Sequence, residues 1–125
     1  MKFLFINLEI KLGINFYNKT LLVNSLTHKS FYNQHNNEKM EFLGDRVLGL
    51  VIAKKLLEIY PDEKEGILDK KFASLVNKKT VIEDKVVADS CEALIGAIYL
   101  DRGLTTVEKI ILNLWKKHLE RSVIT

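Results

Sequence analysis

Two pairs of acidic residues stand at helical spacing in two distant parts of the chain. Glu41 and Asp45 are four residues apart, and Asp89 and Glu92 are three apart, so each pair shares one face of a helix. Adjacent carboxylates repel each other, and partial burial increases that cost. Each pair leads into apolar residues on the same face, which predicts that both faces turn toward a core.

If the two apolar faces pack together, the four carboxylates converge. Oxygen ligands without cysteine or histidine favour a hard divalent cation, Mg²⁺, for which Mn²⁺ can substitute. A water held by such a cation can be activated for attack on a phosphodiester. A simpler interpretation stays open at this point, because acidic residues at this spacing also occur on solvated helix faces.

Two glycines accompany the acidic pairs. Gly44 lies inside the first pair, where it costs about 1 kcal/mol of helix propensity relative to alanine. Gly96 follows the second pair and would let another helix approach closely. The glycines therefore predict a tight contact close to the carboxylates.

Helical spacing recurs along the chain while strand-like alternation is nearly absent, which predicts an all-α fold. Asn18 is a candidate N-cap, Tyr60-Pro61 should stop the longest helix, and Gly103 is a candidate C-cap. About six helices are expected, at residues 6–12, 19–27, 37–59, 64–79, 84–101 and 105–121.

The composition predicts one soluble domain over residues 1–125, with 47% hydrophobic and 28% charged residues. The single cysteine, Cys91, excludes an internal disulfide and a cysteine zinc cluster, and we expect it to pack in the core, as we do Trp115 and Phe16. The longest apolar runs are too short to span a bilayer, and no cleavage site follows the first residues. We therefore expect no membrane partner and a cytoplasmic location. The net charge of +3 permits a nucleic-acid partner without requiring one.

Residues 37–50, Asn-Glu-Lys-Met-Glu-Phe-Leu-Gly-Asp-Arg-Val-Leu-Gly-Leu, resemble the signature helix of the ribonuclease III family. Residues 88–101, Ala-Asp-Ser-Cys-Glu-Ala-Leu-Ile-Gly-Ala-Ile-Tyr-Leu-Asp, resemble the second acidic helix of that family. Residues 26–30, 61–66 and 73–77 match its smaller motifs. The resemblance covers nearly the whole chain in the correct order.

The resemblance implies an all-α endonuclease domain that cleaves double-stranded RNA as a homodimer. It places Glu41, Asp45, Asp89 and Glu92 around Mg²⁺, with Glu41 and Glu92 closest and with Asp45 and Glu92 as the catalytic pair. It gives Glu38 and Glu65 supporting roles in the same acidic valley, and Phe42 the role of an aromatic knob that enters the partner subunit. Each centre would cut one strand, giving 5′-phosphate and 3′-hydroxyl ends in the processing of ribosomal or other structured RNA.

Basic residues should offset the acidic centre when RNA binds, because duplex RNA is recognised through its phosphates and 2′-hydroxyls. Phe72 stands where this family usually has a basic residue, which weakens that contact. For any single lysine, a solvated helix face remains the simpler interpretation. The candidates for weak RNA contacts are Lys70, Lys71, Lys78 and Lys79.

The chain departs from the family in two ways. Only ten residues, 78–87, separate Asn77 from Ala88, where relatives usually have a longer segment. The chain also ends at Thr125, without the double-stranded-RNA-binding domain that commonly follows. These departures keep open an alternative, a catalytically inactive RNA-binding or ribosome-associated module.

Overall fold

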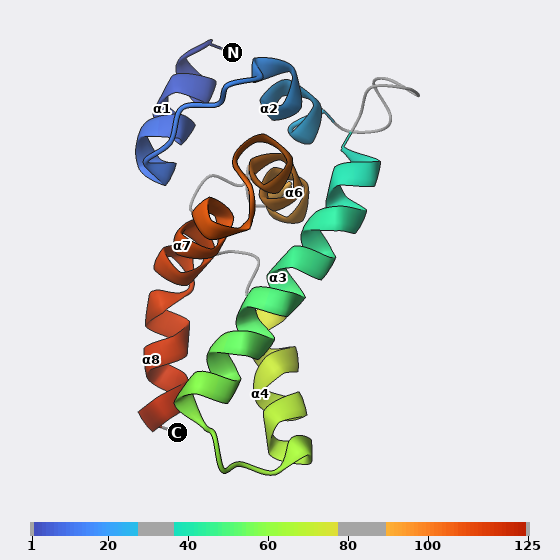
Figure 1. The fold of residues 1–125 in the computed structure, drawn as a ribbon. Helices are drawn as coiled ribbons and strands as arrows, with labels where there is room; N and C mark the ends of the chain where they lie inside the picture. Colours follow the sequence, from blue (N-terminus) through green and yellow to red (C-terminus); the bar gives the residue numbers. More distant parts are fainter. Residues whose placement is uncertain (1, 28–36, 78–89, 125) are drawn as a thin grey trace.

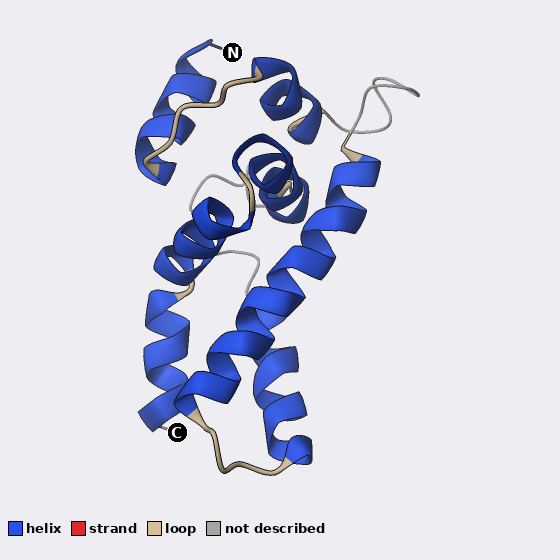
Figure 2. Ribbon diagram, viewed as in Figure 1, coloured by secondary structure: helices blue, strands red, loops and turns tan. Residues whose placement is uncertain are grey.

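The computed structural model describes residues 2–27, 37–77 and 90–124 (Figure 1). Within these ranges the chain forms helices and no strand, which confirms the all-α fold class (Figure 2). Asp89, Lys78 and Lys79 lie outside the described residues. The helices are α1 (Lys2–Leu12), α2 (Lys19–Ser25), α3 (Glu38–Ile59), α4 (Glu65–Val76), α6 (Cys91–Arg102), α7 (Leu104–Leu114) and α8 (Lys116–Ile124).

Three expected helix ends are confirmed by their backbone geometry. The Asn18 side chain accepts a hydrogen bond from the Thr20 N–H at 3.0 Å and so caps α2. The longest helix ends at Ile59, with Tyr60 as its C-cap immediately before Pro61. Gly103 has a φ of 84°, a conformation that glycine adopts without strain, and it separates α6 from α7.

The expectation of one helix over residues 105–121 is wrong. Trp115 adopts φ −89° and ψ 0°, and separates α7 from α8, so the described ranges hold seven helices rather than six. Its indole is fully buried, and Nε1 donates a hydrogen bond to the Leu75 carbonyl at 2.7 Å. The break lies where this indole meets the end of α4, and apolar periodicity carries no sign of such a contact. The expected helix over 84–101 also begins later, at Cys91, with Ser90 as its N-cap.

Helix α6 lies at the centre of the molecule, packed against α2, α3 and α7 (Figures 1 and 2). Every residue from Cys91 to Ile98 is buried, as a helix surrounded by other helices requires. Cys91, Trp115 and Phe16 all belong to the core, as expected. No helix of the described ranges is long and apolar enough to cross a membrane.

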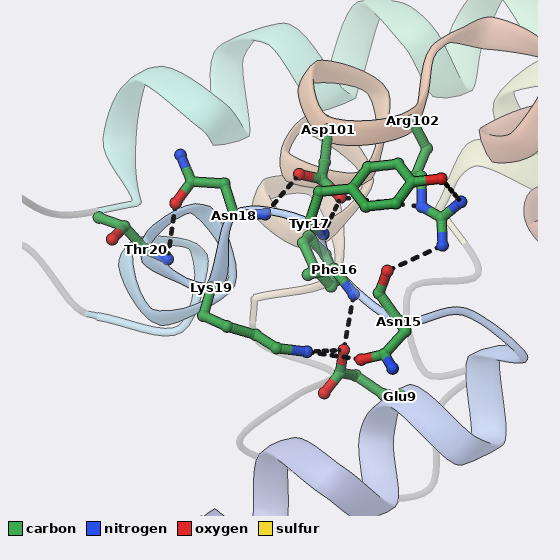
Figure 3. A network of polar contacts seen from close by, with 9 residues as sticks. All are labelled: Glu9, Asn15, Phe16, Tyr17, Asn18, Lys19, Thr20, Asp101 and Arg102. Carbon is green, nitrogen blue, oxygen red and sulfur yellow. Dashed lines mark hydrogen bonds and ion pairs between the residues drawn. The ribbon is translucent and has the colours of Figure 1, made fainter.

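The segment between α1 and α2 is fastened to the end of α6 (Figure 3). The Asp101 carboxylate accepts hydrogen bonds from the Tyr17 and Asn18 N–H groups, both at 2.9 Å. Arg102 donates to the Tyr17 hydroxyl and the Asn15 carbonyl at 2.8 Å, and its guanidinium lies 4.0 Å from the Tyr17 ring centroid. These contacts hold residues 15–18 beside the last turn of α6.

We predict that Asp101→Ala lowers the free energy of unfolding by about 1–2 kcal/mol. The substitution removes both charge-assisted hydrogen bonds, but the two N–H groups are exposed and can bind water instead. Urea unfolding followed by circular dichroism measures the change. Asp62→Ala, an exposed acid in the loop after α3, is the control and should change stability by less than about 0.5 kcal/mol. Equal stability of the two variants would contradict this role of Asp101.

Candidate active site

Helices α3 and α6 touch backbone to backbone at their crossing. A Cβ atom built on Gly44 would lie 1.6 Å from the Glu92 carbonyl oxygen. A Cβ atom built on Gly96 would lie 2.2 Å from the Met40 carbonyl oxygen. The close approach predicted from Gly96 is therefore confirmed, and any side chain larger than hydrogen at either glycine would force the helices apart.

This crossing places Glu92 beside the turn of α3 that bears the first acidic pair. Glu92 lies in the first turn of α6 and is only 8% exposed, and its Oε1 atom is inaccessible to solvent. Glu41 and Asp45, on either side of Gly44 in the sequence, are exposed on α3. The structure thus brings the backbone of Glu92 against the turn of α3 that bears the first pair, while Asp89 lies outside the described residues.

Asp45 makes an ion pair that sequence analysis missed. Its Oδ2 atom lies 3.2 Å from Nη1 of Arg46, and both side chains are more than half exposed. The Arg46 guanidinium also lies 4.1 Å from the ring centroid of Phe42, one helical turn earlier. The signal was present in the sequence, since an arginine next to an acid and four residues after an aromatic side chain can reach both.

The side chains fit a hard divalent cation in kind but do not form a closed cage. Glu41, Asp45 and Glu92 supply oxygen ligands only, the type that Mg²⁺ and Mn²⁺ prefer. In the part of the chain that the structure describes, no three acidic, histidine or cysteine side chains gather closely enough to hold a metal ion. A cation here would be held by the buried Glu92 carboxylate together with the exposed carboxylates of Glu41 and Asp45.

The two supporting acids lie in different places. Glu38 is exposed in the first turn of α3, one turn before Glu41. Glu65 begins α4 and lines a pocket of about 310 Å³ together with Phe72 and residues 53, 56 and 57 of α3. Residue 53 is eight residues beyond Asp45, about 12 Å along the helix axis. Within one chain, Glu65 therefore lies away from the crossing.

The predicted dimer and RNA contacts differ in their exposure. Phe42 is 64% exposed, which suits a side chain that enters another subunit. Lys70 is exposed on α4. Lys71 is half-buried, and its Nζ donates to the Ser122 carbonyl at 3.1 Å and lies 4.6 Å from the Tyr60 ring centroid. The Lys71 ammonium thus joins α4 to α8.

Comparison with known proteins identifies the family to which this chain and its fold belong. The family model for Ribonuclease-III-like proteins matches residues 18–84. The nuclease domain of ribonuclease III from Campylobacter jejuni superimposes with a TM-score of 0.80 and 35% identity, over 88% of this chain and 94% of that one. A second structure of that domain gives a TM-score of 0.78 and 34% identity, over 89% and 92% of the two chains. The fold is that of ribonuclease III nuclease domains.

The chain belongs to the ribonuclease III-like family. It is 58% identical to Ribonuclease 3 of Pelagibacter ubique over 144 residues, which cover 96% of this chain and 65% of that protein. It is 42% identical to Ribonuclease 3 of Campylobacter fetus over 132 residues, covering 86% of this chain and 59% of that protein. The chain therefore spans somewhat less than two thirds of the length of these relatives.

The matched regions of the relatives are longer than the chain that matches them. The Pelagibacter match extends over 144 residues, whereas 96% of this 125-residue chain is about 120 residues. About 24 positions therefore have no counterpart in this chain. The Campylobacter fetus match leaves a similar excess, about 24 of its 132 positions. The expected shortening between Asn77 and Ala88 falls on residues outside the described ranges.

Proposed function

We propose that the chain is the catalytic domain of a metal-dependent endoribonuclease specific for double-stranded RNA. The observation that supports the proposal is the contact of Gly44 with the backbone carbonyl of Glu92, which brings the first turn of α6, where Glu92 is buried, against the α3 turn of Glu41 and Asp45. Membership of the ribonuclease III-like family supports an endoribonuclease activity at this place.

Glu41, Asp45, Asp89 and Glu92 would hold Mg²⁺, or Mn²⁺ in its place. The cation would supply Lewis-acid stabilisation of charge at the phosphodiester and a more acidic water. Glu92, held at the start of a buried helix, gives the cation a fixed point. Asp45, Glu41 and Asp89 would complete the ligand set, with Asp45 and Glu41 contributing from exposed positions on α3. Asp45 and Glu92 are the residues whose loss should affect the reaction most.

The products expected from this chemistry carry 5′-phosphate and 3′-hydroxyl ends. The natural substrates would be structured RNAs such as ribosomal precursors in the cytoplasm. Lys70, Lys71, Lys78 and Lys79 would contribute weak phosphate contacts. Because Lys71 also holds α4 to α8, its replacement should lower stability as well as RNA affinity.

A homodimer fits two features of the site. The exposed Phe42 ring would enter the partner subunit. Glu65 lies beside the C-terminal half of α3, so if it serves the acidic centre it must do so from the second chain. The matching nuclease domain from Campylobacter jejuni has structural flexibility in a region involved in dimer formation, which supports the same assembly here.

Cleavage of a labelled RNA duplex by the purified chain tests the proposal. We expect fragments in the presence of Mg²⁺ or Mn²⁺, none with a chelator, and none from either single strand alone. End analysis should show 5′-phosphates and 3′-hydroxyls. Low salt is required, because affinity that rests on phosphate contacts falls steeply with ionic strength. An intact duplex under all these conditions would reject the enzyme.

The alternative is an inactive RNA-binding or ribosome-associated module with the same fold. It is favoured by the residues that relatives have and this chain lacks, and by the open arrangement of the described acids. It predicts duplex RNA binding without cleavage and no electron density for metal at the helix crossing when crystals are soaked in Mn²⁺. Bound Mn²⁺ together with cleavage would exclude it.

A further inference from the structure

Arg46 joins two side chains to which the proposed function gives separate tasks. Its guanidinium contacts the Asp45 carboxylate on one side and lies over the Phe42 ring on the other. Both Phe42 and Arg46 are more than 60% exposed, so the guanidinium stands at the surface and not in the core. Arg46 therefore places a positive charge directly at a proposed metal ligand.

A divalent cation can readily replace Arg46 as the partner of the Asp45 carboxylate. Exposed ion pairs contribute little to stability, because water screens them and both side chains must be ordered. A divalent cation that takes the Asp45 carboxylate competes with Arg46 for the same oxygen atoms and repels its charge. The guanidinium must then leave the carboxylate, while its contact with Phe42 can persist, because cation–π attraction does not depend on the acid.

A guanidinium released at this position faces the approaching RNA. Arginine binds phosphate through two parallel hydrogen bonds, which fixes orientation as well as charge. A duplex recognised by its backbone must bring phosphates to the exposed side of the acidic centre. The ring of Phe42 would keep the guanidinium close to that side.

We propose that Arg46 is a positioning residue. In the metal-free protein it forms an ion pair with Asp45, and when a divalent cation binds the Asp45 carboxylate, the Arg46 guanidinium binds an RNA phosphate instead. The proposal rests on the proposed function and adds to it a residue outside the acidic set. It predicts two separate effects of replacing Arg46: higher affinity for the cation without RNA, and lower affinity for RNA in the presence of the cation.

Calorimetric titration of the metal-free chain with Mn²⁺ tests the predicted effect on cation affinity, and it requires no RNA cleavage. Arg46→Met should bind Mn²⁺ about two- to fivefold more tightly than the unaltered chain, the gain expected when an exposed competing charge is removed. Lys54→Met is the matched control. Lys54 also lies on α3 in an exposed ion pair, with Glu108 at 3.0 Å, which raises the pKa of the lysine. It is about 13 Å beyond Asp45 along the helix axis, which exceeds the Debye length of about 8 Å in 0.15 M salt, so its charge is largely screened from Asp45.

Steady-state cleavage of duplex RNA tests the predicted effect on RNA affinity. Arg46→Met should raise KM about tenfold and leave kcat within about twofold, because a binding contact is lost and the reacting groups remain. Arg46→Lys should recover part of the loss in KM, since lysine binds phosphate as a point charge. The slope of log affinity against log salt should fall in magnitude by nearly one for Arg46→Met. Lys54→Met should leave KM and kcat unchanged.

Specific results would overturn the proposal. Unchanged or weaker Mn²⁺ binding by Arg46→Met would show that Arg46 does not compete for Asp45. An unchanged KM and salt slope, or a fall in kcat alone, would show that Arg46 holds no phosphate. Sedimentation must find the same oligomeric state for every variant. If the unaltered chain cleaves no RNA, the proposed function fails, and Mn²⁺ titration with RNA-binding measurements still decides the role of Arg46.

Discussion

Replacing Glu92 by glutamine should lower kcat for duplex RNA cleavage by at least about a hundredfold while the protein stays folded. Loss of a residue that only orients a metal ligand already costs about ten- to a hundredfold, so loss of a ligand itself should cost at least as much. Glutamine has the size of glutamate and fits the same buried place in the first turn of α6. Circular dichroism checks the fold, and calorimetry should show weaker Mn²⁺ binding.

The control for this substitution is Glu58→Gln, the same chemical change at an exposed residue near the C-terminal end of α3. Its kcat should equal that of the unaltered chain within about twofold. Cleavage by Glu92→Gln at the rate of the control would remove Glu92 from the reaction and with it the main support for the proposed centre.

Replacing Gly44 by alanine should lower the free energy of unfolding by about 3 kcal/mol or more. Overpacking usually costs about 1–3 kcal/mol, and here the new methyl group meets the backbone carbonyl of Glu92, which has no alternative rotamer. Because ordinary domains are stable by only about 5–15 kcal/mol, the loss is large. Urea unfolding measures it, and any folded protein that remains should cleave RNA poorly, since α6 must shift against α3.

Gly66→Ala is the matched control for this effect. No atom lies within 4 Å of a Cβ built on Gly66, in the first turn of α4, and its φ is not positive. Alanine favours helix over glycine, so this variant should be equally stable or gain up to about 1 kcal/mol. If Gly44→Ala unfolds at the same urea concentration as Gly66→Ala, the backbone contact of α3 with α6 does not exist in solution.

Local patterns in the sequence were sufficient to predict the fold class and the crossing. Helical spacing indicated an all-α chain, Pro61 marked the end of α3, and Gly96 indicated the approach of another helix. Each of these signals acts within a few residues of its own position. Family resemblance added the roles of the acids, and all of these roles, including those of Glu38 and Glu65, stay predictions.

Contacts between distant residues were beyond these patterns. The break at Trp115 coincides with a hydrogen bond to Leu75, and Lys71 is held by Ser122, each across at least 40 residues. Such pairings depend on which helices meet and at what angle, and a lysine that binds a carbonyl has the same sequence signature as one in solvent. The contacts of Arg46 are of another kind, because they join residues one and four positions apart and have a local signature in the sequence.

The attachment of residues 15–18 to the end of α6 also has a consequence for synthesis of the chain. Asp101 lies 84 residues after Tyr17, from whose N–H group it accepts a hydrogen bond. At about 5–20 residues per second, the ribosome produces Asp101 roughly 4–17 s after Tyr17. Throughout that interval the Tyr17 and Asn18 N–H groups lack the carboxylate that binds them in the folded protein. Residues 15–18 can therefore take up their native contacts only after the last turn of α6 has been synthesised.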